Sequence, residues 1–298
     1  MDRCQASFAE AFSYRALAVA WQRVRSNDGA AGGDGVAIAD FMRGERANLL
    51  TLQRSLSSGH YRPGPLRRVE IPKKDGGLRE LAIPCVADRI AQTAWLFALS
   101  PAIDPAMSAS SFAYRPARSV RMALQAVRRH IAEGRVWVVD ADIWSFFDRV
   151  PHARLLDELR RWVTDARLRA LVALWLRRAA PGGRGLPQGS PISPVLANIY
   201  LDSLDRWLAT AGIVSVRYAD DFVLLCRTRV EAKAARAAIG RQLATRGLAL
   251  NSGKTRVCRA DAGVRFLGEW LTPARPRWWA RSKGRALSIW NVRRPRQV

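Results

Sequence analysis

Lysine, cysteine and histidine are scarce in this sequence. The 298 residues include 5 lysines, 4 cysteines and 3 histidines. The cysteines lie far apart and form no CxxC pair, which excludes a disulfide framework and, with so few histidines, argues against a structural zinc site. No apolar run reaches the length of a membrane span, and the first residues are charged where a signal sequence would be apolar. We therefore expect a cytoplasmic protein that does not enter a membrane.

Acidic residues are also scarce for a chain of this length. The sequence has 49 lysines and arginines against 25 aspartates and glutamates, a formal net charge of +24. A GC-rich codon usage explains why arginine replaces lysine, but it does not explain the shortage of acids. The positive electrostatic field of such a charge attracts polyanions, and this favours nucleic acid as the partner. A ribosomal or anionic-membrane partner is the alternative that composition leaves open.

The first 134 residues predict helices around one hairpin. Phe8, Phe12 and Trp21 follow a helical spacing and predict an amphipathic helix. The run Asp75-Gly76-Gly77 favours a tight turn between two strands, because glycine accepts positive φ. The elements predicted here are a helix in residues 1–26, a flexible glycine-rich loop at 27–35, a helix at 40–57, strands at 66–72 and 78–83, and helices at 86–99 and 119–133.

From residue 135 the pattern changes to strands that alternate with helices. Ser193 and Pro194 predict the N-cap and first turn of one helix, and Thr228 with Glu231 predicts a capping box for another. The order strand, helix, hairpin, helix, strand predicts an α+β protein with a ferredoxin-like (split βαβ) sheet and its helices on one face. The predicted elements are strands at 136–139, 214–218 and 222–226, helices at 152–179 with a break near 164, at 193–208 and at 228–246, and short strands near 248, 256 and 266.

Three aspartates are predicted to meet at one edge of that sheet. Asp142 follows the first strand, and Asp220 and Asp221 lie in the turn of the hairpin. Crowded carboxylates repel one another and are stable chiefly with a divalent cation between them, and oxygen ligands select magnesium or manganese. Two such ions can activate a hydroxyl and stabilise a leaving pyrophosphate, which is phosphoryl transfer. For the Asp-Asp pair alone, a solvated surface turn is the open alternative.

Six segments, in order, resemble the sequence boxes of reverse transcriptases, over roughly residues 60–272. The phrases VRYADDFVLLC at 216–226 and SSFAYRP at 110–116 are most similar to the bacterial group II intron lineage, which includes the reverse transcriptases of CRISPR adaptation. The six segments are IPKKDGGLR at 71–79, DIWSFFD at 142–148, LPQGSPISP at 186–194, YADD at 218–221, LNSGKT at 250–255 and FLGE at 266–269.

The resemblance implies a right-hand polymerase that makes DNA on an RNA template. Asp142 and Asp220 would be the principal ligands of two magnesium ions, which manganese can replace, with Asp221 adjacent to them. Lys73 and Arg79 would clasp the triphosphate of the incoming deoxynucleotide, because a lysine point charge and an arginine fork suit phosphate oxygens.

Three further residues receive roles from the same resemblance. Gln188 would line the nucleotide pocket, and Lys254 would protonate the leaving pyrophosphate, although a lysine in a loop can also be merely solvated. Phe147 would form a wall under the sugar that clashes with a 2′-hydroxyl, with burial in the core as the alternative. Trp144 departs from the family, where many relatives carry a small or basic residue, and would alter template contact or simply pack.

The resemblance also divides the chain and implies its partners. We expect a helical extension at residues 1–59, fingers at 60–134, a palm at 135–272 and a basic, tryptophan-rich tail at 273–298, with the thumb short or absent. The tail could stack on bases and neutralise phosphates, or be a thumb fragment. The expected partners are an RNA template, a primer and deoxynucleotides, and an integrase or a thumb-supplying protein is a candidate as well.

Two other functions stay open from the sequence. An RNA-dependent RNA polymerase shares the palm, but it usually carries glycine before the paired acids, where this chain has Ala219. A non-catalytic RNA-binding or maturase-like protein derived from a polymerase is the second, because fold does not dictate function. The retained aspartates argue against it, since a pure binder needs no cluster of repelling carboxylates. The sequence does not distinguish an intron, CRISPR spacer acquisition or phage defence as the biological setting.

Overall fold

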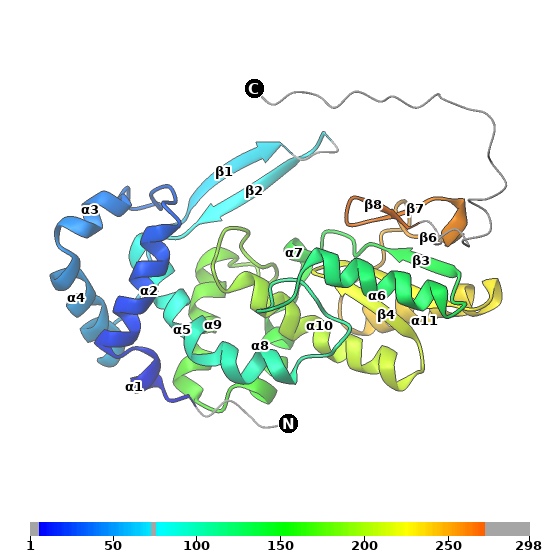
Figure 1. The fold of residues 1–298 in the computed structure, drawn as a ribbon. Coiled ribbons are helices and arrows are strands. Elements are labelled where there is room, and N and C mark those ends of the chain that lie inside the picture. Colours follow the sequence, from blue (N-terminus) through cyan, green and yellow to red (C-terminus); the bar gives the residue numbers. More distant parts are fainter. Residues whose placement is uncertain (1–5, 73–75, 272–298) are drawn as a thin grey trace.

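The computed structural model describes residues 6–72 and 76–271, and Figure 1 shows helices at one end, a four-stranded sheet toward the other, and a projecting two-stranded hairpin. The helices are α1 (Phe8–Ala11), α2 (Tyr14–Ser26), α3 (Ile38–Arg43), α4 (Glu45–Ser57), α5 (Val86–Ala106), α6 (Val120–Ala132), α7 (Phe146–Arg149), α8 (His152–Trp162), α9 (Ala166–Ala179), α10 (Ser193–Thr210) and α11 (Arg229–Thr245). The strands are β1 (Arg67–Pro72), β2 (Leu78–Ile83), β3 (Trp137–Ala141), β4 (Val214–Tyr218), β5 (Asp221–Cys226), β6 (Arg256–Arg259), β7 (Val264–Phe266) and β8 (Glu269–Leu271).

Two helices predicted as continuous are each broken in two. Ser13 ends the first, because its Oγ accepts from the Ala16 amide at 3.2 Å and caps the start of α2. Gly44 separates α3 from α4, and Asn48 Nδ2 donates to the Phe41 carbonyl at the end of α3 at 3.0 Å. The predicted break near residue 164 is confirmed between α8 and α9, where Asp165 caps the second helix.

The palm sheet has the strand order β4-β5-β3-β6, and each neighbouring pair is antiparallel. The chain runs from β3 through helices to the β4–β5 hairpin, then through α11 to β6. This order places β5 between β3 and β4, as the split-βαβ prediction requires. The predicted fold class is therefore confirmed in the palm. The strand order brings the end of β3 and the β4–β5 turn to the same edge of the sheet.

The prediction that helices lie on one face of this sheet is wrong. Val139 and Leu224 pack on one face in a core that includes α10 and α11. Val138, Val216 and Val223 point to the opposite face and pack against α6 and the β7–β8 hairpin. Successive residues of a strand point to opposite faces, so an apolar strand with both faces buried needs cover on both sides. Helix α6, predicted as part of the fingers, supplies that cover.

The larger of two hydrophobic cores joins the N-terminal helices to one face of the palm sheet. It includes Trp21 of α2, Trp95 of α5 and Trp175 of α9, all buried. Trp95 Nε1 donates to the Leu168 carbonyl at 3.1 Å and ties α5 to α9. The predicted domain boundaries stay predictions, since one core crosses them. Among residues 6–72 and 76–271, no helix combines the length and apolar content needed to cross a bilayer.

The β1–β2 hairpin is largely exposed. Its strands pair from Arg67 opposite Ile83 to Pro72 opposite Leu78, as predicted. Arg68 and Glu80 form a cross-strand ion pair at the surface. The turn that holds Lys73 lies outside the described residues, and so does the predicted tail at 273–298.

Candidate active site

Asp142 follows β3 directly and is oriented by the segment after α11. Asn251 Nδ2 donates to Asp142 Oδ2 at 2.8 Å, and the Asn251 amide donates to the Asp142 carbonyl at 2.8 Å. The next residue, Ile143, forms a β-bridge with Leu250. The side chain of Asp142 is half-buried. Asn251 therefore fixes how this carboxylate faces the sheet edge.

The other two aspartates lie where β4 turns into β5. Tyr218 pairs with Asp221, so Ala219 and Asp220 form a two-residue turn. Ala219 has φ 60°, a left-handed conformation that such turns need and that glycine usually supplies. Its carbonyl accepts from Arg217 Nη1 at 2.9 Å. The turn holds Asp220 half-buried and Asp221 exposed.

Both acidic segments open onto one cavity of about 780 Å³, a volume in the range of small-molecule sites. Its wall combines the fingers hairpin, the loop before α6, the loop after β3, the loop before α10, the β4–β5 turn and the loop before β6. Of the residues predicted from sequence, those that line it are Arg79, Asp142, Phe147, Gln188, Asp220, Asp221 and Lys254. The fold thus brings together all the predicted site residues that are described.

The aspartates perturb one another across this cavity. Although Asp221 is exposed as a whole residue, desolvation of its carboxyl raises the pKa of Asp221 to about 6, and the charges of Asp220 and Asp142 add to the effect. Burial also raises the pKa of Asp220, again with a contribution from Asp142. Lys254 acts in the opposite direction on the pKa of Asp221. Because the ionised forms are disfavoured, a cation that entered the cavity would relieve the repulsion.

The donor chemistry of this cluster suits a hard divalent cation, since all its ligand atoms would be carboxylate oxygens. The side chains of these aspartates are, however, spaced more widely than the ligands of a bound ion. No three aspartate, glutamate, histidine or cysteine side chains within 6–72 and 76–271 gather closely enough to form a finished metal centre. The structure therefore shows carboxylates on the wall of one cavity, coupled through their charges.

The loop before α10 carries Gln188 and joins the palm to the fingers hairpin. The Ala82 amide of β2 donates to the Gln188 carbonyl at 2.7 Å. Gly189 has φ 107°, and a Cβ there would lie 3.1 Å from the Ala82 carbonyl oxygen, so glycine is needed at this approach. The prediction that Ser193 caps α10 is wrong: α10 begins at Ser193, and its Oγ donates to the Pro187 carbonyl at 2.7 Å, which closes the loop.

Phe147 and Trp144 differ in how they meet the cavity. Phe147 is half-buried, lines the cavity and lies edge-to-face against Phe146 at 5.3 Å between ring centroids. Its ring therefore packs against Phe146 and also faces the cavity, which fits both the predicted wall under the sugar and the alternative of burial in the core. Trp144 is 48% exposed and also lines the cavity, with the Arg149 guanidinium 3.5 Å from its ring centroid. It is a surface residue of the site and does not fill the core.

Two cavity residues were missed in the sequence. Asn251 belongs to the LNSGKT box, yet only the fold shows that it orients Asp142. Tyr114 belongs to the SSFAYRP phrase and lines the cavity with φ 58°. A bulky residue in the left-handed region is uncommon, and backbone strain of this kind gathers at functional sites. No neighbouring residue in the sequence predicts the left-handed conformation of Tyr114.

The profile of one protein family, described as "Reverse transcriptase (RNA-dependent DNA polymerase)", matches residues 71–271 and so spans all six boxes. The chain belongs to the reverse transcriptase family. It is thereby a member of a family of RNA-directed DNA polymerases, which in general use divalent metal ions. The resemblance that the boxes predict is confirmed.

Two curated proteins and one solved structure are similar to this chain. Protein YkfC of Escherichia coli (strain K12) is 35% identical over 83% of this chain. Group II intron-encoded protein LtrA of Lactococcus lactis subsp. cremoris is 32% identical over 64% of it, which supports the predicted intron lineage. Telomerase from Candida albicans, solved with a fragment of telomeric RNA, covers 76% of the chain with a TM-score of 0.52 and 13% identity. That likeness concerns the fold alone, and it agrees with the right-hand polymerase prediction.

The reverse transcriptase domain of this chain corresponds to only part of most of these proteins. The chain spans 77% of YkfC, but 33% of LtrA and 49% of the telomerase chain. The activities of those longer proteins are therefore carried to this chain as proposals only.

Proposed function

We propose that this chain copies an RNA template into DNA by extending a primer with deoxynucleotides at the cavity between palm and fingers. The observation that carries the proposal is the convergence of Asp142, the Asp220–Asp221 turn and Arg79 on one cavity of about 780 Å³. The formal net charge of +24 supports a nucleic-acid template and primer as partners, most naturally in the cytoplasm. Membership of the reverse transcriptase family supports the reaction.

Asp142, Asp220 and Asp221 would hold divalent cations, magnesium or in its place manganese, because both favour carboxylate oxygens. Cations bound there would activate the primer 3′-hydroxyl and neutralise charge on the triphosphate. Asn251, which already donates to Asp142 Oδ2, would keep that carboxylate turned toward the cavity. Titration with manganese, followed by electron paramagnetic resonance, measures this binding without any turnover.

The remaining side chains would handle the nucleotide. Arg79, together with Lys73 of the same sequence segment IPKKDGGLR, would clasp the triphosphate through charge-assisted hydrogen bonds. Gln188 would contact the nucleotide from the loop before α10. Lys254 would give a proton to the leaving pyrophosphate, and its place on the cavity wall allows this.

Primer extension with a matched pair of variants tests the proposal. Asp142 and Asp140 lie two residues apart, but only Asp142 lines the cavity. With an RNA template, a DNA primer, deoxynucleotides and magnesium or manganese, we expect synthesis by the wild type and by Asp140→Asn, and none by Asp142→Asn. Binding of template and primer should be the same in all three. No synthesis by the wild type in either metal would favour a non-catalytic RNA-binding role or a required protein partner.

Phe147 offers the test that separates a reverse transcriptase from an RNA-dependent RNA polymerase. If its ring forms the wall under the sugar, Phe147→Val should raise ribonucleotide use relative to deoxynucleotide use by about 10- to 200-fold. Single-nucleotide incorporation with each sugar measures the ratio. A wild type that prefers ribonucleotides would replace the proposal with the RNA polymerase reading. The setting, whether an intron, CRISPR spacer acquisition or phage defence, stays a prediction.

A further inference from the structure

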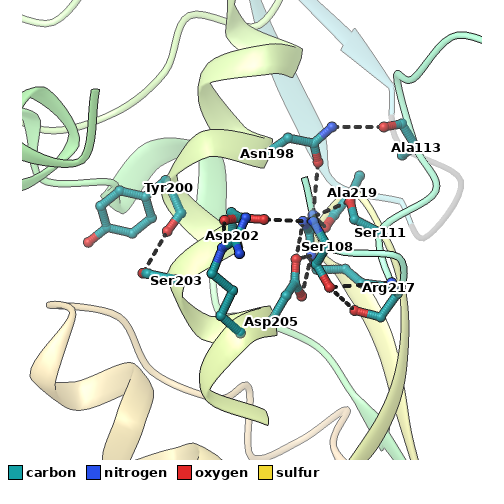
Figure 2. A network of polar contacts seen from close by, with 12 residues as sticks. Ser108, Ser111, Ala113, Asn198, Tyr200, Asp202, Ser203, Asp205, Arg217 and Ala219 are labelled. Carbon is teal, nitrogen blue, oxygen red and sulfur yellow. Dashed lines mark hydrogen bonds and ion pairs between the residues drawn. The ribbon is translucent and has the colours of Figure 1, made fainter. Parts of the chain in front are cut away.

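Arg217 on β4 lies at the centre of a buried polar network. Its side chain is 2% exposed, and that of its ion-pair partner Asp205 on α10 is 1% exposed. The guanidinium has five N–H groups, and all of them have acceptors (Figure 2). The contacts are Nε to Asp205 Oδ1 at 2.9 Å and Oδ2 at 3.0 Å, Nη2 to Asp205 Oδ2 at 2.6 Å and to Ser111 Oγ at 2.8 Å, and Nη1 to Asn198 Oδ1 and to the Ala219 carbonyl, both at 2.9 Å.

One of these contacts reaches the acidic turn. The Ala219 carbonyl belongs to the peptide bond that leads into Asp220, and Ala219 is held at φ 60°. A non-glycine residue keeps such a conformation only where its surroundings enforce it. Arg217 Nη1 supplies that constraint through its hydrogen bond to the Ala219 carbonyl, one of the dashed lines in Figure 2. The orientation of the Asp220 backbone is therefore tied to a buried guanidinium.

A second branch of the network reaches the segment that carries Tyr114, another residue of the cavity wall. Asn198 on α10 accepts from Arg217 and donates through Nδ2 to the Ala113 carbonyl at 2.8 Å (Figure 2). The next residue is Tyr114, which lines the cavity at φ 58°. This one network therefore binds the backbone at both left-handed residues. It holds Ala219 through its own carbonyl and Tyr114 through the carbonyl of the preceding residue, Ala113.

The backbone of Arg217 joins the same two walls. Its amide donates to the Ser110 carbonyl at 2.8 Å, and its carbonyl accepts from the Phe112 amide at 2.9 Å. These bonds lay residues 110–112 alongside β4, next to the acidic turn. Side chain and backbone of one arginine therefore connect the segment that leads to Tyr114 with the turn that holds Asp220.

Fold stability alone does not call for this arrangement. Removing two charges from water opposes their attraction, and a packed apolar pair of similar size often serves a fold equally well. What an apolar pair cannot do is donate hydrogen bonds to fixed carbonyls in a planar fork. The geometry points to a role in placement.

We propose that Arg217, with Asp205 and Asn198, is a buried clasp that positions Asp220 relative to Tyr114 for the polymerase reaction. Arg217 is a positioning residue, since it does not line the cavity itself and acts on it through the Ala219 carbonyl. The inference rests on the proposed function, because the reaction it serves is primer extension.

The decisive variant removes the clasp without leaving a buried charge. In Arg217→Met/Asp205→Leu both charges are gone, so we expect a folded protein with a thermal melting curve near that of the wild type. Single-turnover primer extension should nevertheless slow by on the order of 10²-fold, because the carboxylate is displaced. Affinity for template and primer should be unchanged. Amide hydrogen exchange in residues 218–221 should be faster than in the wild type.

Two single variants complete the design. Arg217→Lys keeps a positive charge beside Asp205 but lacks the fork, and should show the same catalytic loss. Arg246→Lys is the matched control. Arg246 is 8% exposed and joins α11 to α10 through Gln242 and Ser203, yet none of these residues lines the cavity. This control should keep the wild-type rate of extension.

The outcomes are separable. A double variant that extends primers within about threefold of the wild type overturns the clasp. The clasp is equally overturned if Arg246→Lys loses as much activity, or if the double variant does not fold, because the network would then serve stability. If the wild type itself makes no DNA, the proposed function fails first and the positioning role fails with it.

Discussion

The cavity is bordered by two β-hairpins, β4–β5 from the palm and β1–β2 from the fingers. In the palm hairpin, Leu224 is buried on one face and Val223 on the other, and the turn is held by Arg217. In the fingers hairpin nearly every residue is at least partly exposed, and its cross-strand ion pair lies at the surface. Both hairpins present charged residues to the same space.

The difference matches the two tasks we assign. Carboxylates that must share an ion need a fixed separation, and burial on two faces with a clasped turn provides it. An arginine that clasps a mobile triphosphate is guided by the ligand's own charge, so its hairpin needs less packing. A β-hairpin is thus buried on both faces where it carries the carboxylates, and largely exposed where it carries the arginine.

The largest expected effect tests whether the hairpins differ in their share of the core. Leu224 of β5 is fully buried and Leu78 of β2 is 59% exposed. Leu224→Ala should lower the free energy of unfolding by about 2–5 kcal/mol through lost burial and a cavity. Leu78→Ala should change it by less than about 0.5 kcal/mol. Urea unfolding measures both changes. An equal loss of unfolding free energy in the two variants would contradict the difference in burial between the two hairpins.

The next prediction concerns the fingers hairpin as an arm for the nucleotide. Arg79→Ala should lower kcat/KM for a deoxynucleotide by about 10- to 150-fold, the worth of hydrogen bonds to a charged group. Arg67→Ala is the control, because Arg67 lies on the same hairpin but not on the cavity wall. Steady-state kinetics at fixed template and primer measure both. A similar loss in the two variants would point to general attraction of nucleic acid.

The smallest effect concerns repulsion among the palm carboxylates. The pKa of Asp221 is about 6 in the folded protein, above the ordinary 3.8, so its ionisation opposes folding. The penalty is absent below pH 3.8, grows as the pH rises toward about 6, and is complete above that value. Asp221→Asn should therefore be the more stable protein above pH 6 and match the wild type near pH 3.8.

Because Asp221 is exposed, this gain should stay below about 1 kcal/mol. Thermal melting across the pH range measures it, and magnesium should narrow the gap by stabilising the wild type. Glu80→Gln on the exposed hairpin is the control and should change stability by less than about 0.5 kcal/mol. A wild type that is the more stable protein at neutral pH without metal would contradict the repulsion.

Much of the palm could be predicted from the sequence. Its strands are short apolar runs bounded by turn residues, and their order with the helices specifies a split-βαβ sheet. The site residues follow from the boxes, because each box sits at the end of a strand or in a loop that the fold brings to one edge. Asp142 and the Asp220–Asp221 turn required no knowledge of distant contacts.

What the sequence did not predict depends on tertiary contacts. Periodicity shows that α6 has an apolar face but not which sheet face it covers. Helix α5 was expected to end at residue 99, before Pro101. It continues to Ala106, where Ile103 is buried and Arg115 donates to both the carboxylate and the carbonyl of Asp104. Proline is a strong breaker, and here packing overrides it.

The Arg217 clasp could not be predicted for the same reason. Its members come from the loop before α6, from α10 and from β4, and no spacing in the sequence relates them. Arg217 reads there as one more arginine in a basic chain. Only burial and the complete set of acceptors distinguish it.

Single-turnover primer extension by Asp220→Ala, with template and primer already bound, tests the central claim most directly. We expect the wild type to make DNA on an RNA template in magnesium or manganese. We expect the variant to make none while its affinity for template and primer is unchanged. DNA synthesis by Asp220→Ala at a rate near that of the wild type would contradict the claim that this cavity is the catalytic site.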